Sequence, residues 1–298
     1  MAPRLVPTAA HPINIRQALR IAIADLQAAE VPSAELAAEL LLMHVLGRDR
    51  AYLYTNPEIN LAPEAAERYF TLVAERATGK PTQYITGRQE FWGLDFEVTP
   101  DVLIPRPETE HLVETVLELA RADDRGGAGL RIADAGTGSG CVALALASEL
   151  PRAFIYGIDI SWPALQVAGR NARRLGLDDR VGFVQADLLS PLTGVSLDFV
   201  VSNPPYVGGD EVDRVQREVR EWEPRVAWGG TGRGDEIYVR LFAQAAKALR
   251  PQGQVVVEVG YSQAEIVTEL LGTGWSGVGV RPDLAGIPRV VTGRKNPE

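Results

Sequence analysis

The sequence is poor in the residues that build metal and disulfide sites. Among 298 residues there is one cysteine, Cys141, and there are three histidines, His11, His44 and His111. A single cysteine excludes an internal disulfide and a zinc site made of several cysteines. The histidines lie far apart and show no ligand spacing. We therefore expect no metal site.

Long apolar segments are also missing. No hydrophobic run approaches the roughly 20 residues that span a bilayer, and the N-terminal residues lack the apolar segment of a secretory signal. Hydrophobic residues still make up 46% of the chain, which is enough for a large core. We expect a soluble, cytoplasmic protein without membrane contact, and a monomer.

Positive charge is in deficit. Lysine and arginine number 30 against 39 aspartates and glutamates, which gives a formal net charge of −9. Tight, sequence-independent binding to nucleic acid needs basic side chains that displace counterions from the phosphates. Direct nucleic-acid binding is therefore not expected, whereas a protein partner is compatible with this balance.

The first part of the chain has a helical pattern. Residues 14–80 carry apolar side chains at three-to-four spacing and contain no convincing strand pattern. We expect Ser33 to cap one helix, Gly47 to end it, and Pro63 to lie in the first turn of another. Since the length favours two domains, residues 1–80 are predicted to form a small helical bundle.

The pattern changes after residue 80. Apolar residues among Gly87, Gly93 and Pro100 predict a hairpin linker over residues 81–105. A helix is expected from about Glu108 to Ala120. The glycine-rich stretch 123–129 that follows is predicted to be a flexible connection.

The remainder, residues 106–298, alternates between strand and helix patterns. Strands are expected at 130–135, 154–158, 181–184, 197–201 and 254–259, and near 277–280 and 289–292. Helices are expected at 141–150, 164–175 and 236–249. This alternation implies right-handed crossovers and predicts an α/β domain with a doubly wound, mostly parallel, seven-stranded sheet.

A glycine loop follows the strand expected at 130–135. It reads Gly136-Thr137-Gly138-Ser139-Gly140. Glycine adopts positive φ readily and lets the backbone approach a ligand closely. Dinucleotide-binding dehydrogenases and class I methyltransferases both use such loops. The GxGxG spacing differs from the dinucleotide fingerprint GxGxxG and favours a methyltransferase.

Acidic residues follow the next two strands. Asp159 is placed to accept both ribose hydroxyls of a nucleoside, which suits NAD and S-adenosylmethionine equally; capping of the next helix is the alternative. Asp187, beside Leu188, either contacts the adenine amino group or is an ordinary loop carboxylate. Both are included in the predicted cofactor site. Cys141 is interpreted as a packing residue, because no partner base lies near it in the sequence.

The tetrad Asn203-Pro204-Pro205-Tyr206 ends another expected strand. A planar amide or aromatic amine nitrogen is a weak nucleophile, and acceptors on its two hydrogens favour methyl transfer. Asn203 and Pro204 supply a side-chain and a backbone carbonyl, the prolines stiffen the segment, and Tyr206 offers an aromatic face. A proline-rich turn is the alternative, but the glycine loop and Asp159 argue against it. We predict an S-adenosylmethionine-dependent methyltransferase that acts on a planar nitrogen.

With these motifs in this order, the sequence resembles the release factor glutamine methyltransferase family. The matching segments read PTQYITG (81–87), EFWG (90–93), VLIPRPETE (102–110), DAGTGSG (134–140), GIDIS (157–161), VSNPPY (201–206), EP (223–224) and VEVG (257–260). Residues 14–80 match only as a helical domain. Ala135 replaces a leucine that is common in the family. Residues 231–235 and 287–288 also differ from the residues usual in the family, and these two differences leave the peptide contacts open.

The resemblance implies methylation of the glutamine amide in the Gly-Gly-Gln motif of peptide chain release factors, which modulates translation termination. The residues from Gly136 to Gly140, with Asp159, would bind the cofactor. The tetrad would hold the substrate glutamine, with Asn203 also near the cofactor. Residues 104–110 would wall the site, with Arg106 and Glu108 as structural or cofactor-adjacent residues, and the helical domain would help to bind the release factor.

Three other functions are weighed against this one. A sister family methylates a glutamine of a ribosomal protein, but its counterpart of PRPETE usually reads differently. An adenine amino methyltransferase should carry a basic surface or a target-recognition domain, and this chain shows neither. A non-catalytic scaffold would not need the glycine loop, Asp159 and the tetrad together.

Overall fold

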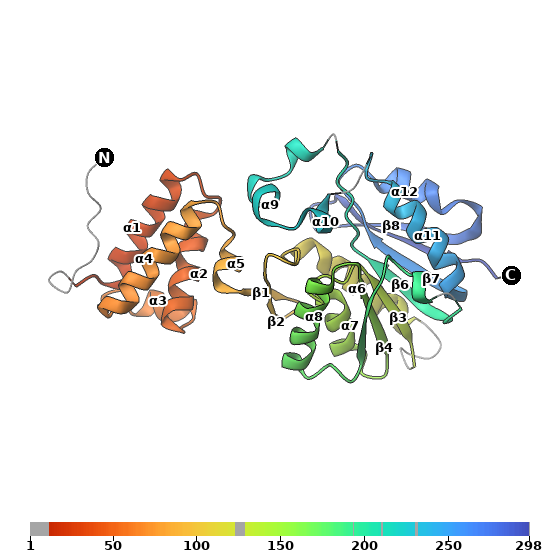
Figure 1. Cartoon of the computed structure of the whole chain (residues 1–298), viewed down its shortest axis with the longest axis horizontal. Coiled ribbons are helices and arrows are strands. Elements are labelled where there is room, and N and C mark those ends of the chain that lie inside the picture. The colour runs from red at the N-terminus through yellow and green to blue at the C-terminus, as the bar shows by residue number, and fades with distance from the viewer. Residues whose placement is uncertain (1–11, 123–128, 193, 210, 230–231, 298) are drawn as a thin grey trace. The chain divides into compact units, whose positions relative to one another are not determined.

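The chain divides into two compact units, with the division between Gly87 and Arg88. The computed structural model describes residues 12–122, 129–192, 194–209, 211–229 and 232–297 (Figure 1). The expected flexible stretch at 123–129 therefore lies, apart from Gly129, outside the described residues, as do residues 230 and 231. The segment 81–105, expected to be one hairpin linker, is divided between the two units.

The first unit is helical, as predicted. Its elements are α1 (Ile15–Ala28), α2 (Ala34–Leu46), α3 (Arg50–Thr55), α4 (Pro63–Ala77) and α5 (Thr82–Thr86). The apolar faces of these helices share one core. Tyr69 of α4 is fully buried in it, and its hydroxyl donates a hydrogen bond to the carbonyl of Ala38 at 3.1 Å. The helix α5 was not expected.

The helix ends agree with the sequence in most places. Gly47 ends α2 in the left-handed conformation, and Pro63 is the first residue of α4. The expected cap at Ser33 is wrong: its backbone is left-handed, with φ 51° and ψ 47°, and its side chain makes no capping hydrogen bond. An N-cap side chain reaches the first turn from an extended backbone, and Asn14 before α1 has that geometry.

The second unit opens with the antiparallel hairpin of β1 (Arg88–Phe91) and β2 (Leu94–Glu97). Its helices are α6 (Glu110–Arg121), α7 (Cys141–Glu149), α8 (Trp162–Leu175), α9 (Arg217–Trp222), α10 (Arg225–Trp228), α11 (Glu236–Ala248) and α12 (Ala264–Leu271). The short helices α9 and α10, and α12, were not expected.

The main sheet is seven-stranded in the order β5-β4-β3-β6-β7-β9-β8. Its strands are β3 (Arg131–Ala135), β4 (Phe154–Asp159), β5 (Val181–Gln185), β6 (Leu197–Ser202), β7 (Leu249–Glu258), β8 (Trp275–Pro282) and β9 (Pro288–Lys295). The first five pair in parallel, and β9 runs antiparallel to both of its neighbours. The predicted doubly wound, mostly parallel sheet is confirmed.

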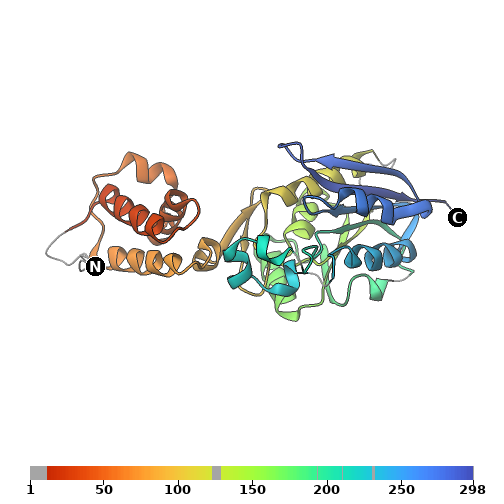
Figure 2. The same cartoon turned by 90° about the horizontal axis from the view of Figure 1, so that it is seen from above.

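Helices cover both faces of this sheet (Figure 2). On β3, Ile132 faces the core formed with α6 and α7, whereas Ala133 faces the core formed with α11 and α12. Side chains alternate between the two faces of a strand, so a strand buried on both faces is apolar throughout. The continuous apolar runs in the sequence have this physical cause.

The strand order reverses between β3 and β6. In doubly wound sheets, ligands bind in the crevice beyond the carboxyl ends of the strands at such a reversal. Ala135 at the end of β3 pairs with Ser202 at the end of β6, and the Ser202 hydroxyl donates to the Ala135 carbonyl at 2.7 Å. The glycine loop and the Asn203 tetrad therefore start side by side.

Candidate active site

A cleft of about 280 Å³ lies at the carboxyl ends of β3, β4 and β6. It brings together residues that the sequence placed far apart. The predicted site residues that line it are Gly136, Thr137, Gly138, Ser139, Asp159, Asp187, Leu188, Asn203 and Pro205. Of the expected wall at residues 104–110, the cleft is lined by Pro105, Arg106 and Thr109, and the preceding residues Asp101, Val102 and Leu103 line it as well.

The glycine loop needs its glycines for conformation. Gly136, Gly138 and Gly140 have φ values of 78°, 54° and 82°, a region that other residues adopt at a cost. Gly140 is not among the cleft-lining residues. A Cβ there would lie 3.2 Å from the Cβ of Ala168, so this glycine lets the loop pack against α8.

Asp134 anchors the glycine loop by hydrogen bonds, although it is not among the site residues predicted from the sequence. Its buried carboxylate accepts the Thr137 hydroxyl at 2.7 Å and the Ala143 N–H at 3.2 Å. Burial raises the pKa of Asp134 to about 7. An acidic residue inside an apolar strand was the available signal, because such a carboxylate needs partners.

Asp159 contacts the loop directly. Its Oδ2 accepts the Gly138 N–H and its Oδ1 accepts the Ser161 N–H, both at 2.9 Å. Burial raises the pKa of Asp159 above its ordinary value. Ser161, whose hydroxyl accepts the Ala164 N–H, caps α8, so the alternative reading of Asp159 as the cap is wrong. A carboxylate oxygen has more than one acceptor site, so Asp159 can still accept hydroxyl groups.

Asp187 and Cys141 lie on the cleft in different environments. Asp187 is exposed and forms an ion pair with Arg240 of α11. Burial raises the pKa of the Cys141 thiol to about 12, so the thiolate that a nucleophile needs is scarce at neutral pH. This environment favours the packing interpretation of Cys141.

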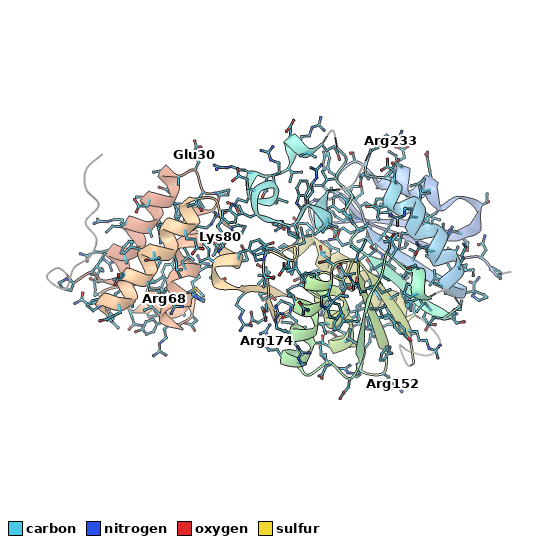
Figure 3. All side chains as sticks on the ribbon, viewed as in Figure 1. Glu30, Arg68, Lys80, Arg152, Arg174 and Arg233 are labelled. Carbon is cyan, nitrogen blue, oxygen red and sulfur yellow. The ribbon has the colours of Figure 1, made fainter. Side chains whose placement is uncertain are left out.

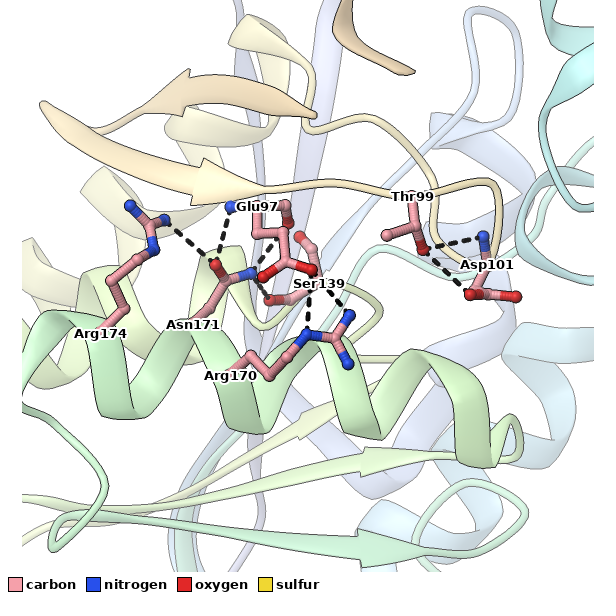
Figure 4. Close-up of polar contacts among 7 residues, drawn as sticks. All are labelled: Glu97, Thr99, Asp101, Ser139, Arg170, Asn171 and Arg174. Atoms are coloured by element: carbon pink, nitrogen blue, oxygen red, sulfur yellow. Dashed lines mark hydrogen bonds and ion pairs between the residues drawn. The ribbon is translucent and has the colours of Figure 1, made fainter. Parts of the chain in front are cut away.

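Asn171 on α8 ties the hairpin to the glycine loop (Figure 4). Its side chain is fully buried; its Oδ1 accepts the Glu97 N–H at 2.7 Å, and its Nδ2 donates to the carbonyls of Glu97 and Ser139, each at 3.0 Å. Arg170 and Arg174 bind Glu97 and Asp95 beside it. The hairpin is thus anchored to the loop through one amide.

A second, smaller cavity of about 130 Å³ adjoins the tetrad. Pro204 and Tyr206 line it together with Trp228 of α10. Four residues line both cavities, namely Leu103, Arg106, Asn203 and Ala227. Asn203 therefore stands between the larger cleft and the smaller cavity.

Buried polar groups connect the two ends of the tetrad. The Asn203 Nδ2 donates to the Thr109 Oγ at 3.1 Å, and the Thr109 hydroxyl donates to the Glu258 carboxylate at 2.7 Å. The Tyr206 hydroxyl donates to the same carboxylate at 3.4 Å. Burial raises the pKa of Glu258 to about 7. Thr109 and Glu258 occur in motifs quoted above, but nothing in the sequence indicated that they meet.

Arg106 and Glu223 fasten the wall of the cavities. The Arg106 guanidinium contacts the Glu223 carboxylate at 2.5 Å, and that carboxylate also accepts the Ile104 N–H at 3.2 Å. The Trp228 indole N–H donates to the Glu223 carbonyl at 3.2 Å. The resemblance implied either a structural or a cofactor-adjacent role for Arg106 and Glu108. These contacts favour a structural role for Arg106, whereas Glu108 is exposed.

Two family models match the chain: the PrmC N-terminal domain over residues 17–87 and the Methyltransferase small domain over residues 109–222. A release factor glutamine methyltransferase of Koribacter versatilis is 50% identical over 95% of this chain and 99% of its own length. One of Nitratidesulfovibrio vulgaris is 42% identical over 97% of this chain and 98% of its own length. The chain belongs to the release factor glutamine methyltransferase family.

Solved structures agree on the fold of this release factor glutamine methyltransferase family member. A crystal structure of a methyltransferase from Pyrococcus furiosus matches with a TM-score of 0.51 at 18% identity, covering 69% of this chain and 90% of that chain. At that identity the likeness concerns the fold alone. The methyl donor of this family member is S-adenosylmethionine.

The groups around the cleft suit that cofactor. Asp159 offers acceptors at the tip of β4, where ribose hydroxyls bind in this type of sheet. The Ser139 hydroxyl is buried on the cleft and, within the described residues, has no partner of ordinary hydrogen-bond geometry, although the Cys141 thiol interacts with it weakly. A buried hydroxyl of this kind suits a polar ligand atom.

Proposed function

We propose that the protein transfers a methyl group from S-adenosylmethionine to the side-chain amide nitrogen of the glutamine in the Gly-Gly-Gln motif of release factors. One observation carries the proposal: Asn203 lines both the cleft that suits the cofactor and the smaller cavity beside Tyr206. A group held in the smaller cavity by Asn203 thus lies next to the cleft. The full-length relatives named above support release factors as the substrate.

In the proposed methyl transfer, Asn203 and Pro204 accept hydrogen bonds from the NH2 group of the substrate amide. Bound S-adenosylmethionine supplies an electrophilic methyl group. The Asn203 Nδ2 is engaged by Thr109, which leaves its carbonyl oxygen for one hydrogen of the substrate amide. The Pro204 carbonyl is assigned to the other hydrogen. Acceptors aimed at a nitrogen that gains positive charge stabilise the transition state.

The lining of the smaller cavity supports a planar substrate group. Tyr206 and Trp228 present aromatic rings, and Val215 and Val219 add apolar surface. The Tyr206 backbone is fixed because the Gln263 side chain donates to its carbonyl at 2.8 Å. We assign Pro205 and Tyr206 to the glutamine site, and Gly136 to Gly140 with Asp159, Asp187 and Leu188 to the cofactor site.

The helical unit is assigned to recognition of the release factor. An open groove of about 550 Å³ lies on α1 and α3 and is lined by apolar side chains, among them Leu19, Ile23 and Leu53. Grooves of this kind accept apolar side chains of a partner protein.

None of the described helices is long and apolar enough to cross a membrane. We place the protein in the cytoplasm, where translation factors act.

Charge pairing argues against nucleic acid as the substrate. Three of the basic residues labelled in Figure 3 contact carboxylates: Lys80 binds Glu75 at 2.6 Å, Arg174 binds Asp95 at 2.9 Å, and Arg233 binds Asp235 at 2.7 Å. Cations already paired with carboxylates are less available for phosphates.

The test is a methylation assay with labelled S-adenosylmethionine and three acceptors: a release factor, a ribosomal protein mixture, and DNA or RNA oligonucleotides. We expect label on the release factor alone, and mass spectrometry should place it on the Gly-Gly-Gln glutamine. A release factor with that glutamine changed to glutamate is the matched control and should stay unlabelled. Label on ribosomal protein or nucleic acid, with none on the release factor, would contradict the proposal.

A further inference from the structure

Glu258 lies at the end of β7 with only 2% of its surface exposed, behind the tetrad. Its two oxygens face two hydroxyls: one accepts the Thr109 hydroxyl at 2.7 Å, and the other accepts the Tyr206 hydroxyl at 3.4 Å. It is among the residues that line the smaller cavity. A buried carboxylate is costly, so its place among these hydroxyls calls for a physical explanation.

The polarity of the hydrogen bonds supplies that explanation. When Glu258 is ionised its carboxylate only accepts, so Thr109 must then give its single proton to Glu258. The Thr109 oxygen can then only accept from Asn203. The Asn203 amide must therefore turn its NH2 group towards Thr109, which leaves its carbonyl oxygen on the other side. This deduction depends on donor and acceptor chemistry, so it does not depend on which amide atom was assigned as nitrogen.

We propose that Glu258 is a positioning residue that acts through Thr109 to make Asn203 present its carbonyl oxygen, and not its NH2 group, to the reacting nitrogen. The inference rests on the proposed function, because it assigns Asn203 an acceptor role towards the substrate amide. An Asn203 amide turned the other way would place its hydrogens against those of the substrate. The relay thus selects the orientation that can bind an NH2 group.

The second oxygen of Glu258 steadies the other end of the tetrad. Tyr206 is confined further by Gly260, where an added Cβ would lie 3.1 Å from the tyrosine ring. Burial raises the pKa of Glu258, while the Thr109 hydrogen bond and nearby Arg289 lower it. The net pKa is about 7, so the charged, acceptor-only form on which the relay depends predominates above that pH, and the kinetic tests are run there.

The test compares two substitutions of one residue. Thr109→Val keeps the shape of threonine and removes the hydroxyl, whereas Thr109→Ser keeps the hydroxyl. We expect Thr109→Val to lower kcat for release-factor methylation about 10- to 100-fold, while the Kd for S-adenosylmethionine stays within about threefold. Thr109→Ser should recover most of the turnover. Thr115→Val, at a buried threonine of α6, is the matched control and should leave kcat near the wild-type value.

A double-mutant cycle tests whether Glu258 acts through Thr109. Glu258→Gln can place either its oxygen or its NH2 group against Thr109, so it should lower kcat on its own. If the two residues form one relay, the variant carrying both changes should be no slower than the slower single variant within about threefold. Losses that multiply, or equal losses in Thr109→Val and Thr109→Ser, would overturn the relay.

A measurement without turnover separates this inference from the proposed substrate. The side-chain NH2 signals of Asn203, assigned by their loss in Asn203→Ala, should exchange slowly with solvent in wild-type protein and much faster in Thr109→Val. This holds whichever substrate the protein methylates. If wild type leaves release factor unlabelled but shows this protection, the proposed function fails and the relay stands. Rapid exchange of these protons in wild type would overturn the relay.

Discussion

The glycine loop after β3 and the tetrad after β6 begin at paired residues, yet they are held in different ways. The loop is fixed through its backbone: Asp134 and Asp159 accept N–H groups of the loop and its flanks, and Asn171 donates to the Ser139 carbonyl. The side chains of the tetrad are fixed by the relay from Asn203 to Glu258, and one backbone contact, from Gln263 to the Tyr206 carbonyl, supports them. A backbone cradle suits binding, because it holds a ligand in every state, whereas an oriented side chain can act on the transition state alone.

If the glycine loop serves binding and the tetrad serves the transition state, Asn203→Ala has the largest effect and lowers turnover without lowering cofactor affinity. Loss of one acceptor at the reacting nitrogen should lower kcat about 100- to 1000-fold, because a transition-state contact is lost. The Kd for S-adenosylmethionine, measured by calorimetry, should stay within a few-fold. An equal loss of cofactor affinity and turnover would show that the two regions are not separate.

Asp159→Ala should do the reverse. Removing a carboxylate that supports the loop and accepts hydroxyls should raise the Kd for S-adenosylmethionine about 10- to 50-fold, which corresponds to roughly 2 kcal/mol for a charged acceptor. At saturating cofactor, kcat should fall far less. Asp187→Ala, at the other carboxylate assigned to the cofactor site, should raise the Kd less, by about threefold, because Asp187 is exposed and already paired with Arg240. Unchanged calorimetric affinity in Asp159→Ala would contradict the assignment.

Asp134 gives the loop a dependence on pH. Its pKa is about 7 in the folded protein, against about 3.9 for an unperturbed aspartate. Between these values the folded state binds the proton and the unfolded state does not, so this contribution to stability falls as pH rises from about 4 to about 7. Urea unfolding should show that the free energy of unfolding of wild type falls between pH 5 and pH 8. This fall should exceed the one in Asp134→Asn by on the order of 2 kcal/mol. Parallel behaviour of both proteins would refute this role.

The smallest effect is expected from Asn171→Ala, which cuts the link between the hairpin and the glycine loop. We expect a fall in melting temperature of a few degrees and a rise in the Kd for S-adenosylmethionine of about fivefold, because the Ser139 carbonyl loses its donor. Arg173→Ala, at an exposed residue of the same helix, is the control and should leave the Kd unchanged. Equal shifts in both variants would mean that the amide does not support the loop.

Periodicity and motifs predicted most of the fold. The seven expected strands are all present, because strands buried on both faces leave continuous apolar runs in the sequence. The sequence missed α9 and α10, which are too short to show a helical period. It also erred at Ser33, because a residue type that favours caps does not determine its own backbone angles.

Most of the predicted site residues line one cleft, because the carboxyl ends of parallel strands share one edge of a sheet. Gly140 packs against α8 instead, and Pro204 and Tyr206 line the smaller cavity. Gly136 and Asn203 each follow a strand and Asp159 ends one, so the strand pattern of the sequence already placed them at that edge. The sequence also narrowed the roles that we propose for them, since a GxGxG turn and an amide beside two prolines each permit few roles. Only the tertiary structure decided the relay. Thr109 and Glu258 lie 149 residues apart, and which buried donor meets which acceptor depends on how α6 packs on β7.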